Sequence, residues 1–486
     1  MTDWSKASLV ETAEAIASRR TTAREVMEGC LARYRSIGST LACFVELDAD
    51  RALAAADAAD RALREKKPLG PLHGVPLAHK DMYYRAGRVS ACGSRLRAQF
   101  HPTTTATVLD RLDRAGAIEV GRLVMVEFAM GPHGYNQNYP LCRNPWNTDY
   151  IPCGSSSGSG VAVGARLVHG SLGSDTGGSI RCPAAVSGVV GLAPTYGRVS
   201  RHGAMPMSYS LDVVGPLART VRDCARLLRI IAGADQQDAS TFPVPVPDYE
   251  ALIEAPGPLP RIGIAKGYFD RKVHPEVAKA IEEAVAALGK LGFVVREASV
   301  PADMLEEIGE LHPMVMKAEG AANHLDTMRD QQEEYTFEVG HRLHAGFFIP
   351  AANYIRGLKL RGPYLRAFAA AAFADVDLLL TPVIPIPVPT IAATSGKRGK
   401  DYLDMVVALT RNTKVANYLG LPAISVPCGF TTNGLPVAFQ LIGRPFSEHM
   451  LLRSAHRYQQ GTAWHTIEPR IAYATGDPCA LERPAV

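Results

Sequence analysis

Two serine- and glycine-rich turns lie close together in the chain and hold the residue types that nucleophilic chemistry needs. The first reads Gly-Ser-Ser-Ser-Gly-Ser at 154–159, and the second reads Gly-Ser-Asp-Thr-Gly-Gly-Ser-Ile-Arg at 173–181. A serine hydroxyl can attack a carbonyl carbon or relay a proton, and glycine lets a ligand approach the main chain closely. The small, apolar segment 161–168 between the turns indicates a buried element and argues against a flexible linker.

A phosphate-binding loop is the next alternative for sequence of this kind. Neither turn has the spacing G-x-x-x-x-G-K-[ST], and neither contains a lysine. The turns are therefore better explained by serine chemistry than by nucleotide binding.

Lys80 ends a segment of small and apolar residues, 74–81, which predicts a strand. An exposed lysine that protects a sheet edge is the ordinary explanation of such a residue. If the strand is buried, however, desolvation disfavours the charged ammonium and lowers the lysine pKa. A neutral lysine can act as a general base, which is what a serine nucleophile requires.

Lys80 and the two turns together resemble the amidase signature family of Ser-cisSer-Lys hydrolases. Ser155 follows Lys80 by 75 residues (155 − 80) and Ser179 follows Ser155 by 24 (179 − 155), as expected of that family. Agreement of three separate elements in type and spacing is more specific than a single glycine-rich loop. The similarity extends over about 9–464, with departures at Cys153 and at 123–124 (Leu-Val), where the family often has glycine and Thr-Asn.

The resemblance implies a role for each of the three reactive residues. Ser179 would be the nucleophile, and Lys80 would be the general base. Ser155 would relay the proton between them, held by a cis peptide bond with Gly154. The result would be an acyl-enzyme mechanism.

The resemblance also implies supporting groups around the nucleophile. The predicted oxyanion hole consists of the main-chain N–H groups of Thr176, Gly177, Gly178 and Ser179. Ser156 and Asp175 would support the reactive groups, and Arg181 would be a structural ion-pair partner. The predicted substrate pocket includes Met130, Gly131 and Tyr135, which lie in a loop-like segment before the first turn.

Other catalytic interpretations have less support in the sequence. Cys182 could pair with one of the 14 histidines, but no nucleophile motif surrounds it. A Ser-His-Asp hydrolase is disfavoured because no G-x-S-x-G elbow frames Ser179. His79 and His133 have no partners at metal-ligand spacing, so we expect them to be pocket or structural residues. No metal or organic cofactor is expected.

The order of predicted elements indicates an α/β protein. Helical patterns at 9–18, 23–34 and 49–66 precede a βαβ rhythm, and a hairpin is expected from 423–427 to 436–441. The resemblance implies a large, mixed, twisted β-sheet flanked on both faces by α-helices. We expect one amidase signature domain over 1–486, with a helical segment 1–66, a catalytic core at about 60–220 and a helical pocket wall at about 300–400.

Composition limits the classes of partner and location. The 486 residues are 47% hydrophobic, enough for a large core, and the formal charge is only +4. This charge disfavours binding of nucleic acid or a membrane surface, so a small-molecule amide or carbamate is the expected partner, and a homodimer stays open. Nine scattered cysteines and no apolar signal segment predict a cytoplasmic protein without a disulfide or zinc framework.

The substrate is predicted mainly from the resemblance. We expect an amidase that cleaves the C–N bond of small, neutral aryl or alkyl amides, with carbamates, urethanes and esters as further substrates, as in aryl acylamidases. The apolar residues of the predicted pocket favour this hypothesis: Met130, Tyr135, Phe347, Phe348, Tyr354 and Ile384.

Two alternatives remain open. The first is the glutaminase A subunit of a glutamyl-tRNA(Gln) amidotransferase. It ranks second because Thr410 lies in the segment where that group is expected to have an acidic residue that holds glutamine. The other is a scaffold protein that works only in a complex with further subunits.

Overall fold

The computed structural model of the chain describes residues 3–471 and contains a single large β-sheet in that part. The strands, in chain order, are β1 (Phe44–Leu47), β2 (Pro76–Lys80), β3 (Ile118–Leu123), β4 (Gly170–Asp175), β5 (Val190–Ala193), β6 (Val213–Ala218), β7 (Ile262–Lys266), β8 (Val295–Ser299), β9 (Leu378–Pro382), β10 (Ala423–Phe430) and β11 (Pro436–Ile442).

The order of strands across the sheet is β1-β3-β2-β4-β6-β5-β10-β11-β9-β7-β8. Neighbours are parallel in two places, β3-β2-β4 and β9-β7-β8, and antiparallel elsewhere. The sheet is therefore mixed and mostly antiparallel, which confirms the predicted class. The central strands β4, β6 and β5 carry or adjoin the second serine turn.

Helices surround this sheet. They are α1 (Leu9–Ala17), α2 (Ala23–Leu41), α3 (Ala49–Arg64), α4 (Thr107–Arg114), α5 (Ser157–Gly164), α6 (Arg181–Ser187), α7 (Val221–Ile231), α8 (Tyr249–Glu254), α9 (Pro275–Lys290), α10 (Ala302–Asn323), α11 (Leu325–Asp330), α12 (Phe337–Gly346), α13 (Ala351–Ala372), α14 (Ile391–Thr394), α15 (Gly399–Leu419) and α16 (Glu448–Gln460). Short 3₁₀ helices lie at η1 (Trp4–Lys6), η2 (Arg95–Arg97), η3 (Glu127–Ala129), η4 (Gln332–Glu334) and η5 (Trp464–Thr466).

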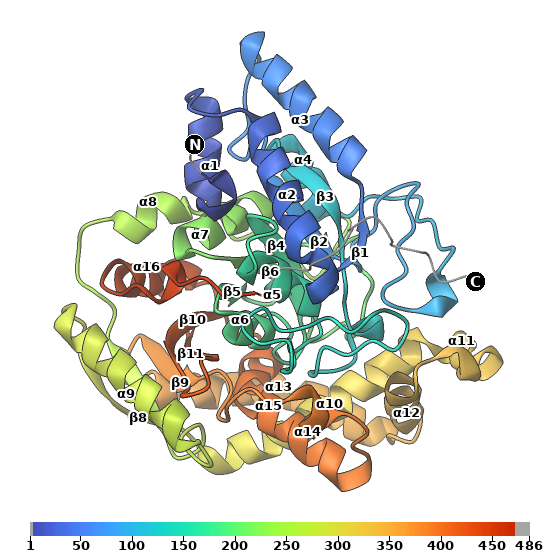
Figure 1. Cartoon of the computed structure of the whole chain (residues 1–486). Coiled ribbons are helices and arrows are strands. Elements are labelled where there is room, and N and C mark those ends of the chain that lie inside the picture. The colour runs from blue at the N-terminus through green and yellow to red at the C-terminus, as the bar shows by residue number, and fades with distance from the viewer. Residues whose placement is uncertain (1–2, 472–486) are drawn as a thin grey trace.

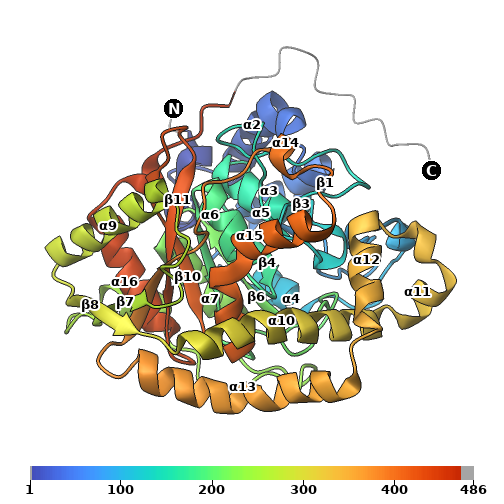
Figure 2. The same ribbon diagram turned by 90° about the horizontal axis from the view of Figure 1, so that it is seen from below.

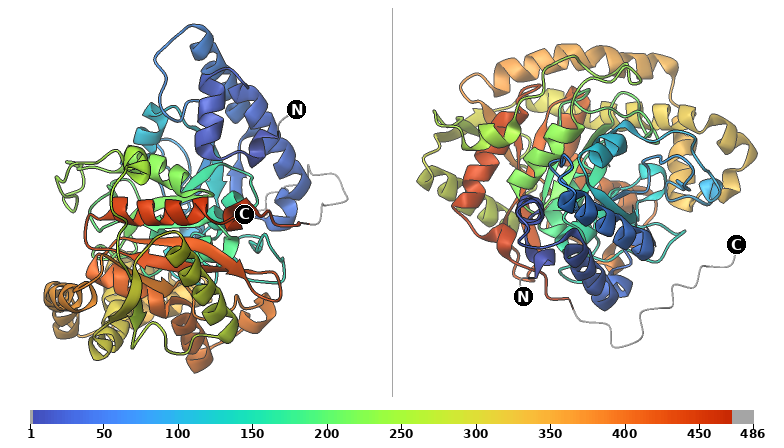
Figure 3. Two further views of the ribbon diagram at one scale, coloured as in Figure 1. Left: turned by 90° about the vertical axis from the view of Figure 1, so that its left-hand side faces the viewer. Right: turned by 90° about the horizontal axis from the view of Figure 1, so that it is seen from above.

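Two groups of these helices lie at opposite ends of the molecule. In Figure 1, α1, α2 and α3 lie at the top in blue, and α10, α12 and α13 lie at the bottom in yellow and orange. The view from below in Figure 2 shows α10 and α13 side by side beneath the sheet. Figure 3 shows the same two groups from the side, with the sheet strands between them.

The packing of strand β2 explains the direction of the Lys80 side chain. Leu77 packs into one hydrophobic cluster with Val221 of α7, whereas Ala78 packs into another with Val161 of α5. Side chains alternate between the faces of a strand, so Lys80 lies on the same face as Ala78. The lysine therefore points toward the side of the sheet that α5 covers.

Elements with a strong local pattern match their predictions. The capping residue Thr22 accepts a hydrogen bond from the Glu25 N–H and starts α2, which extends further than expected. The predicted hairpin forms between β10 and β11. The structure adds strands β1 and β6 and helix α15, none of which the sequence patterns predicted as elements.

Two further features of the described residues bear on the predictions. Eight cysteines are free and buried, while Cys479 lies outside the described residues. In residues 3–471, no helix combines the length and apolar character that crossing a bilayer requires.

Candidate active site

Lys80 lies within hydrogen-bond distance of two serine hydroxyls. Its Nζ is 2.7 Å from Ser155 Oγ and 2.8 Å from Ser174 Oγ, and the side chain is only 1% exposed. Burial lowers the pKa of Lys80 from 10.5 to about 7, although the charges of Asp212 and Asp175 oppose the shift. A large share of Lys80 is therefore neutral near pH 7 and able to accept a proton from a hydroxyl.

The first serine turn leads directly into α5. The Gly154–Ser155 peptide bond is cis, and Ser157 is the first residue of the helix. A Cβ on Gly158 would lie 2.5 Å from the Cys43 carbonyl oxygen and 2.7 Å from the Val124 nitrogen. The glycines of this segment therefore allow α5 to pack directly on the backbone of its neighbours, and this close packing fixes the position of Ser155.

Asp175, the last residue of β4, organises the second serine turn. Its carboxylate accepts hydrogen bonds from the main-chain N–H groups of Gly178 (2.6 Å), Ile180 (3.1 Å) and Arg181 (3.2 Å). Burial alone would raise the pKa of Asp175, but the Arg181 guanidinium and these hydrogen bonds outweigh it and hold the pKa below its ordinary value. The carboxylate thus folds the turn around itself.

Arg181 connects this turn to distant parts of the chain. Its guanidinium pairs with Asp175 at 3.0 Å, and both side chains are fully buried. It also donates to Gln440 Oε1, to the Thr413 carbonyl oxygen and to Asn417 Oδ1. The residue predicted as a structural ion-pair partner is thus a buried link between the turn, α15 and β11.

Ser179 lies in the second turn and contacts the first. The Ser156 N–H donates to the Ser179 carbonyl oxygen at 3.3 Å, which holds the two turns together. The Ser156 hydroxyl and the Ser174 backbone also exchange two hydrogen bonds of 3.3 Å. Ser156 therefore fixes the first turn against both β4 and Ser179.

The four predicted oxyanion donors are not equivalent. Asp175 already accepts the Gly178 N–H, as described above. Within residues 3–471, the N–H groups of Thr176, Gly177 and Ser179 have no such partner. Of the four N–H groups predicted to form an oxyanion hole, the one of Gly178 is therefore already occupied.

A cavity of about 60 Å³ opens beside Ser179. It is lined by the two turns, by the loop before the first turn and by three helices of the lower group in Figure 1. The lining residues are Ala129, Gly131, Pro132, Gly154, Thr176, Gly177, Gly178, Ser179, Met207, His312, Pro313, Met316, Arg342, Val406, Thr410 and Lys414.

The predicted pocket residues occupy different places. Gly131 lines the cavity, whereas Met130 is buried next to it and packs against Gly320. Tyr135 lines a separate cavity and hydrogen-bonds to the Ile391 carbonyl oxygen and to Thr394. Of these three predicted pocket residues, only Gly131 lines the cavity beside Ser179.

Other apolar residues that favoured an aryl pocket also lie elsewhere. Phe348 is 73% exposed and Phe347 is 41% exposed on the surface after α12. Tyr354 of α13 donates its hydroxyl to Glu319, and Ile384 packs in a cluster with Cys182. The departures from the family at Cys153 and 123–124 are outside the cavity lining as well.

The sequence patterns missed three polar residues of the cavity: His312 on α10, Arg342 on α12 and Lys414 on α15. The His312 Nε2–H donates to the Thr176 carbonyl oxygen at 2.8 Å, so this side chain supports the turn. Burial lowers the pKa of His312 to about 3, which keeps it neutral. These residues come from separate helices, and no local pattern of the sequence marks them as parts of one site.

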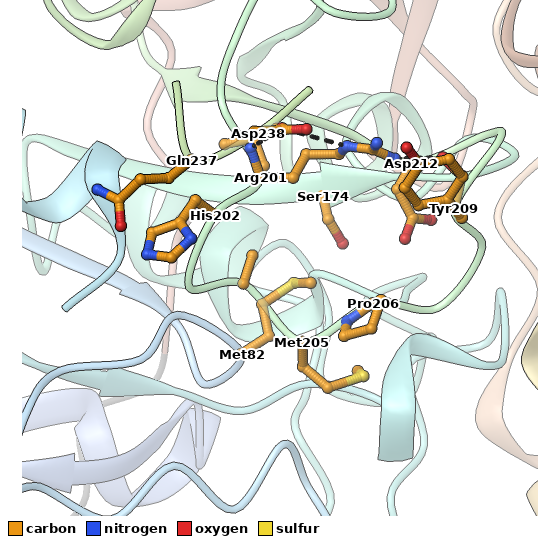
Figure 4. Close-up of a pocket in the computed structure, with 12 residues that line it drawn as sticks. Met82, Ser174, Arg201, His202, Met205, Pro206, Tyr209, Asp212, Gln237 and Asp238 are labelled. Atoms are coloured by element: carbon orange, nitrogen blue, oxygen red, sulfur yellow. Dashed lines mark hydrogen bonds and ion pairs between the residues drawn. The ribbon is translucent and has the colours of Figure 1, made fainter. Parts of the chain in front are cut away.

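A second cavity, of about 180 Å³, shares no lining residue with the first and is shown in Figure 4 with Met82, Ser174 and Asp212 among its walls. Ser174, whose hydroxyl contacts Lys80, is part of its wall together with Asp212. Asp212 accepts hydrogen bonds from the Thr176 hydroxyl and from the N–H groups of Met207 and Ser208. Two separate cavities therefore border the candidate site, one beside Ser179 and one beside Ser174.

The alternative nucleophile and metal interpretations find little support. Burial raises the pKa of Cys182 to about 12, so its thiol stays protonated. His79 accepts a hydrogen bond from the Leu172 N–H and joins β2 to β4, and His133 is buried beside Tyr135. Among residues 3–471, no three His, Cys, Asp or Glu side chains are grouped as metal ligands.

Comparisons with known proteins agree on a family. A sequence model described as Amidase matches residues 25–452. The A subunit of glutamyl-tRNA(Gln) amidotransferase from Pseudomonas savastanoi is 38% identical over 95% of this chain and 99% of its own length.

Solved structures give the same result. The A subunit of the amidotransferase from Thermotoga maritima is 30% identical, with a TM-score of 0.81 over 97% of this chain and 99% of its own. A structure described as a vestigial protein complex that reveals the origins of an s-triazine catabolic enzyme is 33% identical, with a TM-score of 0.86 over 93% and 98% of the two chains.

These relatives contradict two predictions. The prediction of small, neutral aryl or alkyl amides, carbamates and urethanes as substrates is wrong, because full-length relatives carry the name of an amidotransferase subunit. The prediction of small-molecule partners without nucleic acid is also wrong, because that name describes one subunit of an enzyme of glutamyl-tRNA. Net charge is a property of the whole chain, so it could not reveal partners recognised by a local surface or by another subunit.

Proposed function

Because the chain belongs to the amidase family of hydrolases that act on carbon–nitrogen bonds, we propose that it is the A subunit of a glutamyl-tRNA(Gln) amidotransferase. In this role it hydrolyses the side-chain amide of glutamine and releases ammonia for transfer. The main support is identity of 38% over 95% of this chain and 99% of the Pseudomonas relative. The family resemblance drawn from Lys80 and the serine turns is thereby confirmed.

We propose an acyl-enzyme mechanism, which the hydrogen bond of 2.7 Å between Lys80 Nζ and Ser155 Oγ supports. Ser179 Oγ attacks the amide carbon while its proton passes to Ser155, and the Ser155 proton passes to the neutral Lys80 amine. The carbonyl oxygen becomes an oxyanion that the free N–H groups of Thr176, Gly177 and Ser179 stabilise. Such a donor is worth about 10²–10³ in rate.

Collapse of the tetrahedral intermediate breaks the C–N bond. The proton on Lys80 returns through Ser155 to the leaving nitrogen, which departs as ammonia and leaves an ester on Ser179. Water then attacks the ester with the same relay as base, and the proton returns to Ser179 Oγ. Each group ends the cycle in its starting state.

Reconstitution tests the proposal. The chain is combined with the other subunits of the Pseudomonas enzyme in place of their own A subunit, and the complex receives amide-¹⁵N glutamine, ATP and glutamyl-tRNA(Gln). We expect ¹⁵N in the tRNA-bound product and none with Ser179→Ala. Failure of the chain to assemble with those subunits, together with active hydrolysis by the isolated chain, would contradict the proposal.

A further inference from the structure

The cavity that Tyr135 lines has a volume of about 300 Å³. Its walls come from the segment 126–141, from the start of α12 and from residues 395–396, and it shares no lining residue with the cavities beside Ser179 and Ser174. Both of those cavities are smaller. A volume of about 300 Å³ is at the lower end of the range for sites that hold a small organic molecule.

Glu338 is the only charged residue among those that line this cavity. It lies in the first turn of α12, and within residues 3–471 its carboxylate forms neither an ion pair nor a hydrogen bond. Burial raises the pKa of Glu338, and the charge of Arg342, one turn later on the helix, opposes the shift. A partly desolvated carboxylate without a paired cation is costly, so a ligand that supplies the positive charge would be favoured.

Two further polar groups of the lining have no partner in the described part of the chain. They are the Tyr139 hydroxyl and the side-chain amide of Gln137. Other polar residues of the same walls differ, because Asn136 donates to two main-chain carbonyls and Tyr135 donates to the Ile391 carbonyl oxygen. The unpartnered groups can therefore bind a ligand without breaking contacts that hold the walls together.

The chemistry of this lining favours a cation over an anion. A ligand ammonium group could donate to the Glu338 carboxylate, to Gln137 Oε1 and to the Tyr139 oxygen. The rings of Tyr135 and Tyr139 can add cation–π attraction. An anion would meet the carboxylate and no cation of the lining, and an uncharged molecule would leave that carboxylate unpaired.

From this arrangement we infer that the cavity is a binding site for a small organic ammonium ion, with Glu338 as its counter-charge and Tyr139 as part of its wall. The site lies next to the catalytic turns, because Val126, which lines it, donates its main-chain N–H to the Ser155 carbonyl oxygen at 3.1 Å. The inference concerns a second site and does not depend on which amide is cleaved at Ser179.

A charged and an uncharged probe of equal length test the site. Butylammonium and butan-1-ol are titrated separately into the full-length chain at pH 8, where carboxylates and alkylamines are both charged, and binding is followed by ligand-observed NMR. We expect butylammonium to bind about 10-fold more tightly or better, the value of one charge-assisted hydrogen bond. Equal binding of the two probes would overturn the inference.

Variants assign the binding to this cavity. Glu338→Gln should weaken butylammonium binding about 10-fold or more, whereas Glu338→Asp keeps the charge and should retain most of the affinity. Tyr139→Leu removes a ring and should weaken binding about 3-fold or more. Glu282→Gln, at an exposed carboxylate of α9, is the matched control and should bind like the wild type.

The result that overturns the inference is wild-type affinity for butylammonium in Glu338→Gln. Circular dichroism of each variant verifies that it is folded before the titration. The titration needs neither turnover nor other subunits, so failure of the chain to amidate the tRNA would count against the proposed function and leave the ammonium site standing.

Discussion

The main-chain N–H of Gly178 donates to Asp175 Oδ1 at 2.6 Å, which removes one of the four N–H groups expected to stabilise the oxyanion. The same carboxylate holds the Ile180 N–H and the Arg181 guanidinium. Asp175 therefore acts by shaping the turn, and Thr176, Gly177 and Ser179 remain as donors. The rigid carboxylate at the centre of the turn explains how small residues without side-chain contacts of their own keep a fixed conformation.

Asp175→Asn should destabilise the fold and not only the reaction. The change leaves Arg181 buried without its counter-charge, which typically costs about 3–5 kcal/mol. We expect a clear drop in the free energy of unfolding, measured by urea denaturation monitored by circular dichroism. The double variant Asp175→Asn/Arg181→Met should recover part of this loss, and a loss no smaller than that of the single variant would show that the ion pair is not the cause.

Gly178→Ala should remove activity because the turn has no room for a methyl group. Gly178 has φ of +129°, and a Cβ there would lie 2.4 Å from Thr413 Oγ1 and 2.9 Å from Cys182 Sγ. We expect kcat to fall at least about 100-fold, since a displaced turn misplaces Ser179 and its donors. Gly29→Ala in α2, where nothing lies within 4 Å, is the control and should keep full activity. Wild-type kcat in Gly178→Ala would mean that the turn tolerates distortion.

Activity should rise with pH as Lys80 loses its proton. Because burial lowers the pKa of Lys80 to about 7, log kcat/KM should climb with a slope near one below this pH and level off above it. The pH profile of glutamine hydrolysis measures the inflection. A profile without an inflection between about pH 6 and 8 would exclude Lys80 as the titrating base.

Ser174→Ala should move that inflection to lower pH. The Ser174 hydroxyl accepts a hydrogen bond from Lys80 Nζ at 2.8 Å, and it stabilises the charged ammonium more than the neutral amine. Its removal should lower the pKa of Lys80 and reduce kcat about 10-fold through a less well oriented base. If Ser174 had a purely structural role, its removal would lower stability without moving the inflection. The pH profile therefore distinguishes a structural role of Ser174 from an effect on the pKa of Lys80.

The residues of the candidate site around Lys80 were predictable because their signals are local or nearly so. Lys80 stands out in an apolar strand, and Ser155 and Ser179 lie in turns whose glycine content is rare outside loops that bind or react with a ligand. Helix α2 was predicted from its helical pattern at 23–34, and its cap at Thr22 is a local signal of the same kind. In each case a few neighbouring residues determine the local structure, so the sequence pattern is sufficient to predict it.

The far wall of the cavity was not predictable in this way. His312, Arg342 and Lys414 come from three helices that meet only in the folded chain, and none belongs to a motif. Aromatic residues near 347–354 looked like a pocket wall because composition does not show which face of a helix is buried. Phe348 instead lies on the surface, and the resulting expectation of an aryl substrate was wrong.

Thr410→Asp should shift specificity toward glutamine. An aspartate at this position would lie one helical turn before Lys414, where it offsets the positive charge of the cavity and provides a partner for the α-ammonium group. We expect the ratio of kcat/KM for glutamine over glutaramate, which is glutamine without the amino group, to rise about 10-fold, mostly because glutaramate loses affinity. Thr410→Asn has a similar shape without the charge and should leave the ratio near that of the wild type. A rise of equal size in both variants would mean that shape, and not charge, decides which amide the cavity accepts.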